Sequence, residues 1–172
     1  MKYWLMKSEP SEVSIDHLAE RPNQTVDWWG VRNYAARNFM RSMKLGDRAL
    51  FYHSSCPEPG VAGIVEIVKE AYPDPTQFEA GGEYYDPKSP KDDPRWSTVE
   101  VKLVRKVKLL ALADMRTIPA LADMVILRKG NRLSVTPVEP AEWKQVEGSD
   151  KQAVTTKHRD NRIYRLESRI PE

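Results

Sequence analysis

Two neighbouring tryptophans, Trp28 and Trp29, carry the side chains on which a nucleobase could stack. A flipped or single-stranded base is held against aromatic faces, while a few polar groups bind its hydrogen-bonding edge. Ser8, Asn33 and His53 could supply those polar groups. Adjacent tryptophans are nevertheless more often core residues than a cage, so both interpretations stay open at this point.

A helix is predicted over residues 31–43, because apolar residues recur there at helical spacing. Its free N–H groups could hold a phosphate or carbonyl oxygen beside the tryptophans. Arg32 falls within the apolar sector of this helix, so we expect it to snorkel, to pair or to face a pocket. Another face carries Arg37, Arg41 and Lys44, either as a solvated stripe or as contacts to a nucleic-acid backbone.

Each polar candidate also has a structural interpretation. Ser8 could close its strand through local hydrogen bonds, and His53 could be a half-buried strand residue bonded to a carbonyl. Asn33, in the first turn of the expected helix, could bond backbone instead of a base edge, and Tyr52 could belong to the core. Cys56 lacks an evident activating base and is expected to be incidental rather than nucleophilic.

Catalysis is the minority hypothesis. Ser8 and His53 could form a triad with an aspartate, but no Gly-x-Ser-x-Gly elbow is present. Glu9 and Glu66 could act as acid and base toward a nucleotide, although nearly any sequence offers such a pair. The candidate aspartates of the triad are Asp16, Asp27 and Asp47.

The composition predicts one domain that binds nucleic acid only locally. The 172 residues carry 27 Lys+Arg against 25 Asp+Glu, and residues 151–172 alone hold six basic and three acidic residues. The body of the chain is therefore balanced, which excludes the broad basic surface of a nonspecific duplex binder. One cysteine and three histidines speak against a metal centre, and we expect no cofactor.

The same sequence predicts an intracellular protein that does not insert into a membrane. No apolar run of about 18 residues exists, and charges interrupt the amino terminus too early for a signal peptide. We expect a cytoplasmic location, or a nuclear one in a eukaryote.

The elements that must position these residues are mainly strands. We expect strands over residues 2–6, 48–54, 61–71, 96–110 and 131–135. We expect helices over residues 14–20, with Ser14 as the N-cap, over 112–115 and 119–124, and from Pro140. In the strand over 96–110, the expected inward side chains are Val99, Val101, Leu103 and Val107. Residues 72–95 form a long connection with five of the 13 prolines. Because no helix serves as a regular crossover, the predicted class is α+β, with a mixed β-barrel.

Separated motifs in this chain resemble the EVE-domain family. They are Tyr3–Pro10, Trp28 with Gly30–Tyr34 and Ala36–Asn38, Phe51–Ser54 and Leu133–Val135, and the similarity covers about residues 2–146. The resemblance implies a PUA-like barrel with short helices packed around it, related to the YTH readers of methylated RNA. It also implies a pocket for a modified nucleobase and brings no established reaction. The chain departs from the family pattern at Trp29, where an acidic residue is usual, and at Ala35, where glutamine is usual.

We therefore predict a reader of modified DNA or RNA, with an enzyme as the first alternative and a protein-interaction module using residues 72–95 as the second. Protein partners stay open. Ser8, Trp28, Asn33 and His53 should line one concavity. The full set of candidate ligand-binding residues is Ser8, Trp28, Trp29, Gly30, Val31, Arg32, Asn33, Tyr52, His53 and Ser134. The EVE domain is expected to span residues 1–147, and the polar tail over 148–172 receives no function.

Overall fold

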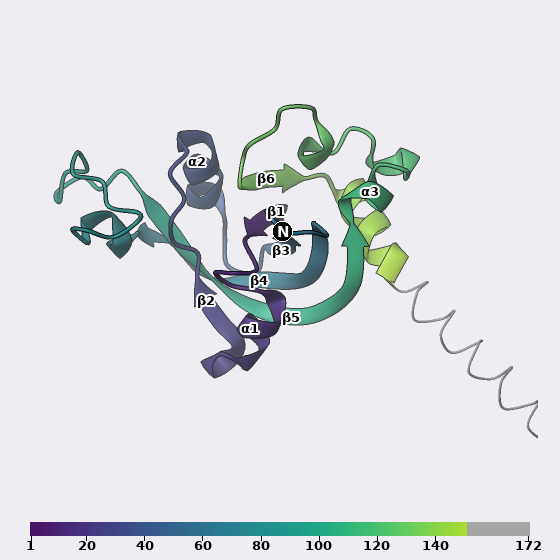
Figure 1. Cartoon of the computed structure of the whole chain (residues 1–172), viewed down its shortest axis with the longest axis horizontal. Helices are drawn as coiled ribbons and strands as arrows, with labels where there is room; N and C mark the ends of the chain where they lie inside the picture. The colour runs from purple at the N-terminus through teal and green to yellow at the C-terminus, as the bar shows by residue number, and fades with distance from the viewer. Residues whose placement is uncertain (151–172) are drawn as a thin grey trace, which may run out of the picture.

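A six-stranded mixed sheet forms the centre of the protein in the computed structural model, which describes residues 1–150. The strands lie in the order β2-β5-β4-β3-β1-β6, with β1 and β3 parallel and the other pairs antiparallel. Figure 1 shows the long strands β4 and β5 bending until the sheet curls toward a barrel. The strands are β1 (Tyr3–Ser8), β2 (Thr25–Asp27), β3 (Arg48–His53), β4 (Gly60–Pro73), β5 (Ser97–Ala111) and β6 (Val135–Val138). The predicted α+β class and PUA-like barrel are confirmed.

Short helices surround this sheet (Figure 1). They are α1 (Ile15–Glu20), α2 (Tyr34–Ser42), α3 (Leu112–Met115), the 3-10 helices Pro22–Gln24, Pro75–Phe78, Pro119–Leu121 and Val125–Leu127, and a helix over 140–150. Ser14 caps α1 as predicted, because its side chain accepts the His17 N–H. Within the described part of the chain, no helix has the length and apolar character needed to cross a bilayer.

Two hydrophobic clusters cover the two faces of the sheet. Strand β3 alternates between them, with Ala49 and Phe51 in the cluster under α1 and α2, and Leu50 and Tyr52 in the cluster under α3 and the 140–150 helix. This is the period of two expected of a strand with two covered faces. Tyr52 is thus a core residue, 3% exposed, which is the structural interpretation given for it above.

One expectation for β5 fails at a set of β-bulges. Leu103 packs with the first cluster, as Val99 and Val101 do, but Val107 packs with the second. The pairing of β4 with β5 shifts between Ile64 and Val65, where an extra residue on β5 interrupts the alternation. A one-residue shift turns every following side chain to the opposite face.

Three other boundaries differ from the sequence prediction. Helix α2 begins at Tyr34 rather than at residue 31, because Asn33 is its N-cap and accepts the Ala36 N–H at 3.0 Å. Strand β6 begins at Val135, where pairing with Met6 of β1 sets its register. The last helix continues to residue 150, past the expected domain end at 147. Most of the tail that we assigned to 148–172 lies outside the described residues.

Candidate functional site

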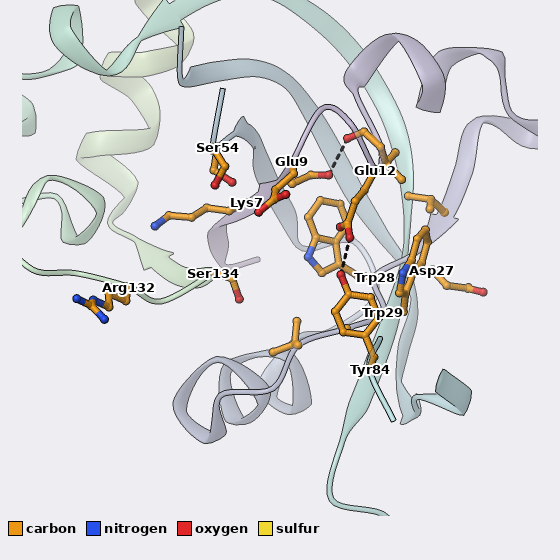
Figure 2. A pocket seen from close by; sticks show the side chains of 16 residues that line it. Lys7, Glu9, Glu12, Asp27, Trp28, Trp29, Ser54, Tyr84, Arg132 and Ser134 are labelled. Atoms are coloured by element: carbon orange, nitrogen blue, oxygen red, sulfur yellow. Dashed lines mark hydrogen bonds between the residues drawn. The ribbon is translucent and has the colours of Figure 1, made fainter. Parts of the chain in front are cut away.

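A cavity of about 350 Å³ lies between the end of β2 and the neighbouring ends of β1 and β6 (Figure 2). Strands β2 and β6 are the two edge strands of the curled sheet, so no strand of the described chain lies between them where the sheet stays open. Side chains from the ends of β1, β2 and β6 therefore meet across the cavity. Its lining residues are Lys7, Ser8, Glu9, Glu12, Val13, Val26, Asp27, Trp28, Trp29, Gly30, Val31, Ser54, Ser55, Tyr84, Arg132 and Ser134. Six of the ten predicted ligand-binding residues are thus brought together: Ser8, Trp28, Trp29, Gly30, Val31 and Ser134.

Trp28 belongs to the core and to the cavity wall at once. Its ring meets Phe51 edge to face at 5.4 Å between centroids, and only 7% of the residue is exposed. Its backbone N–H donates to the Val99 carbonyl, which extends the β2–β5 pairing by one residue. Among the described residues the indole N–H has no acceptor, and Figure 2 shows the ring at the back of the cavity. Trp28 therefore offers an aromatic surface and an unused donor.

Tyr84 forms the wall that faces the tryptophans, and Gly30 makes room for it. Gly30 has a φ of +82°, and a Cβ at this position would lie 2.8 Å from the Tyr84 ring. Only glycine satisfies both conditions without strain. The Tyr84 hydroxyl donates to Glu12 at 2.5 Å, and burial together with this hydrogen bond raises the pKa of the phenol well above its usual value. The Tyr84 ring is therefore held in position by Gly30 against its face and by Glu12 at its hydroxyl.

Arg32 holds the Tyr84 segment in place and does not line the cavity. Its nitrogens donate to the Tyr84 carbonyl at 3.0 and 2.8 Å, to the Val31 carbonyl, to the Thr76 hydroxyl and to Asp74 at 3.0 Å. Asp74 is fully buried and also accepts the Gly30 N–H at 2.8 Å. The pairing that we considered for Arg32 is confirmed, and its donors are already used by the protein.

The long 72–95 connection is an ordered excursion. Gln77 is fully buried, and its amide nitrogen donates to the Asp74 and Trp96 carbonyls at 2.6 and 2.9 Å. The Ser89 hydroxyl donates to the Gln77 side-chain oxygen at 2.6 Å. These bonds tie both ends of the connection to its middle.

The other polar candidates are engaged locally. The Ser8 hydroxyl lines the cavity but donates to the Val13 carbonyl at 2.6 Å. Asn33 caps α2, and His53 Nε2 accepts the Ile15 N–H at 3.1 Å, so its partner is an amide and not the carbonyl that we expected. Neither Asn33 nor His53 lines the cavity, and the predicted four-residue concavity is only half formed.

No triad is assembled from these residues. The Ser8 proton is committed to Val13, and the His53 nitrogen that would take a proton is occupied by an amide. Asp47 accepts the Trp4 indole N–H at 3.2 Å and the Lys2 and Lys44 backbone N–H groups. The imagined Glu9–Glu66 pair is also not formed, because Glu66 lies on β4 opposite Arg48 and outside the cavity.

The predicted basic stripe lies on α2 and just after its end, and its arginines are directed at the protein itself. Arg37 donates to the Arg95 carbonyl at 2.9 Å, and Arg41 donates to the Ser97 hydroxyl at 2.9 Å. Lys44 approaches Glu70 at 3.5 Å across an exposed surface. The two arginines therefore clamp the chain where it enters β5.

Lys7 and Arg132 are cavity residues that the sequence reasoning missed. Lys7 is half-buried at the end of β1, and burial lowers the pKa of its ammonium. The backbone N–H of Lys7 donates to the Ser134 carbonyl at 2.8 Å, which joins β1 to the segment that carries Arg132. Between residues 1 and 150, neither side chain has an ion-pair or hydrogen-bond partner, and no three His, Cys, Asp or Glu side chains gather as metal ligands.

Comparison with known proteins identifies the family. The EVE domain model matches residues 2–148. Human thymocyte nuclear protein 1 is 47% identical over 159 residues, which cover 82% of this chain and 70% of that protein. A crystal structure of the human THYN1 protein in complex with 5-methylcytosine-containing DNA has a TM-score of 0.81 at 45% identity, covering 87% of this chain and 98% of the other.

A hypothetical protein from Leishmania major has the same architecture, with a TM-score of 0.84 at 44% identity over 89% of this chain and 96% of the other. The agreement of sequence motifs, sheet order and these relatives over most of the described residues leads to one conclusion. The chain belongs to the EVE-domain family.

Proposed function

We propose that the protein binds a modified base of DNA or RNA in the cavity beside Trp28 and leaves it chemically unchanged. The observation that carries this proposal is the Trp28 indole, a rigid aromatic wall whose N–H has no acceptor in the described chain. An aromatic face with a nearby donor is what stacking and edge recognition of a base require. The cavity volume of about 350 Å³ also falls in the range of small-ligand sites.

Modified DNA is the first ligand to test. The human THYN1 protein has been crystallised with 5-methylcytosine-containing DNA, and it shares 45% identity and the fold with this chain. Trp29 differs from the acidic residue usual in the family, so the preferred modification could differ as well. A cytosine modified at C5, in single-stranded or flipped form, is therefore the proposed substrate class, and RNA carrying a modified base is the second. We propose the nucleus as the site of action in a nucleated cell, as the name of the human relative suggests, and the cytoplasm otherwise.

The enzyme alternative is less favoured because the groups it would use are occupied. The Ser8 and His53 atoms that a hydrolytic triad needs are bonded to backbone. Incubation with modified nucleosides and oligonucleotides, followed by mass spectrometry, separates the two functions. Recovery of unchanged, bound material supports a reader, and new products support an enzyme.

The decisive variant is Trp28→Ala. It should remove a stacking contribution of roughly 1–3 kcal/mol and abolish discrimination between matched modified and unmodified strands. Titrations of both strands at one salt concentration measure this. Discrimination that survives in Trp28→Ala would exclude the cavity as the reading site.

A second variant is needed because Trp28 also packs on Phe51, and its loss could unfold the protein. Ser134→Phe fills the cavity from the opposite wall and keeps the Trp28–Phe51 contact. Ser11→Phe adds the same ring at an exposed position outside the cavity and serves as the matched control. Ser134→Phe should lose binding and Ser11→Phe should retain it, with circular dichroism showing both folded.

A further inference from the structure

We propose that Lys7 and Arg132 bind the phosphate that flanks the base, so that the nucleic-acid backbone crosses the cavity mouth at the β1–β6 side. This inference rests on the base binding proposed above. It adds a contact to the nucleic-acid backbone, in place of the one expected from Arg37, Arg41 and Lys44.

The first support is the placement of the two cations. Strand β1 ends at Ser8, and the Lys7 N–H donates to the Ser134 carbonyl, so the chain around Arg132 is held beside Lys7. Figure 2 shows both side chains on the same side of the cavity, with their nitrogens directed away from Trp28. A sugar-phosphate attached to a base on Trp28 could reach both groups on that side.

The second support is that both cations lack a counter-charge. Over residues 1–150, neither forms an ion pair, although Glu9 also lines the cavity. Lys7 is half-buried, and an ammonium in that environment is destabilised unless an anion accompanies it. The lowered pKa of Lys7 has this cause. A phosphate would supply the missing charge through charge-assisted hydrogen bonds.

The third support is the acidic character of the other side. Glu12 accepts the Tyr84 hydroxyl at 2.5 Å, and Asp27 accepts the Tyr72 hydroxyl at 2.6 Å. Both carboxylates line the cavity, and Figure 2 shows Asp27 beyond Trp28 from Lys7 and the Glu12 carboxylate at the Trp28 ring, with Glu9 between Lys7 and Trp28. They would repel a phosphate placed on their side. The charge distribution thus favours one direction for the backbone, toward Lys7 and Arg132.

The test compares free 5-methyl-2′-deoxycytidine with its 5′- and 3′-monophosphates by calorimetric titration. At least one monophosphate should bind wild-type protein roughly tenfold more tightly than the nucleoside, as one charge-assisted contact implies. Lys7→Gln and Arg132→Gln should each reduce this gain, measured as the ratio of monophosphate to nucleoside affinity of the same variant. Lys91→Gln and Arg116→Gln, at exposed positions outside the cavity, should keep the full gain.

A second measurement uses single strands that carry 5-methylcytosine. Each cavity variant should lower the slope of log affinity against log salt by about one and preserve the ratio between modified and unmodified strands. The Trp28 variants should behave oppositely, losing the ratio and keeping the slope.

The outcomes separate the two proposals. If neither the nucleoside nor the modified strand binds wild-type protein, base binding fails and the phosphate site with it. If the nucleoside binds but phosphate adds nothing, or if the gain and the salt slope survive in both cavity variants, the phosphate site alone is overturned.

Discussion

The basic side chains of α2 and those beside the cavity differ in what their nitrogens contact. Arg37 and Arg41 donate to the chain around Arg95 and Ser97, and thereby hold the entry to β5. Lys7 and Arg132 line the cavity and have no partner within the described residues. A local excess of positive charge in the sequence therefore does not show by itself which donors the fold leaves without a partner. It is more informative to know whether the donor groups of a basic side chain already hydrogen-bond within the protein.

The largest expected effect concerns Asp74, which pairs with Arg32, another basic residue whose donors the fold already uses. Asp74→Asn should destabilise the protein by about 3 kcal/mol, because breaking a buried ion pair leaves Arg32 without its partner. The buried carboxylate also accepts the Gly30 and Thr76 N–H groups. Urea unfolding measures the loss. Asp92→Asn, an exposed change on the same connection, is the control and should stay within about 0.5 kcal/mol.

A loss as small as that of the control would show that Arg32 and Asp74 do not stabilise the cavity wall.

The next effect tests the α2 arginines directly. Arg37→Gln and Arg41→Gln should each lower the free energy of unfolding by about 1 kcal/mol, since each removes a hydrogen bond to the protein. The salt slope of oligonucleotide binding should not change. Lys44→Gln is the comparison, with little effect on stability because its pair with Glu70 is exposed. Unaltered stability together with a reduced salt slope would mean that the stripe contacts the backbone after all.

The smallest effect is a pH dependence of stability at His53, a titratable group whose nitrogen is occupied. Burial lowers the pKa of His53 below its ordinary 6.5 in the folded protein. The unfolded chain therefore takes up the proton first, and stability should fall as the pH drops through 6.5, until the folded pKa is passed. Urea unfolding at several pH values measures this.

His53→Gln, which retains an acceptor for the Ile15 N–H, should show a shallower loss between pH 7 and pH 5. Equal slopes would indicate that His53 has the same proton affinity in both states. Binding of the nucleoside should depend little on this substitution, because His53 lies outside the cavity.

Sequence reasoning succeeded where a local pattern carries the information. The period of two over 48–54 gave β3 its two faces, and Ser14 was identified as a cap from its type and position. It failed where the partner is distant or the pattern is interrupted. Val107 changed faces at a bulge, and a bulge has no periodic signature.

The site shows the same division. Trp28 and Ser134 were found through motifs, and both line the cavity. Arg32 was singled out correctly as a residue that needs a partner, but Asp74 lies 42 positions away in the chain. Lys7 carries no such signal, since a lysine at the end of a strand usually faces solvent. Tyr84 comes from a proline-rich connection whose path depends on buried contacts such as those of Gln77.

The position of β1 in the sheet has a consequence for biosynthesis. This strand lies between β3 and β6, so its second partner, Val135–Val138, leaves the ribosome more than a hundred residues after it. Until then the apolar strand with Trp4, Leu5 and Met6 has an unpaired edge, which is where nascent sheets aggregate. Because these pairings are distant and one is parallel, folding should be slow, and the sheet can be completed only after β6 has been synthesised. A chain that stopped before β6 would be an unfinished sheet, with one wall of its cavity missing.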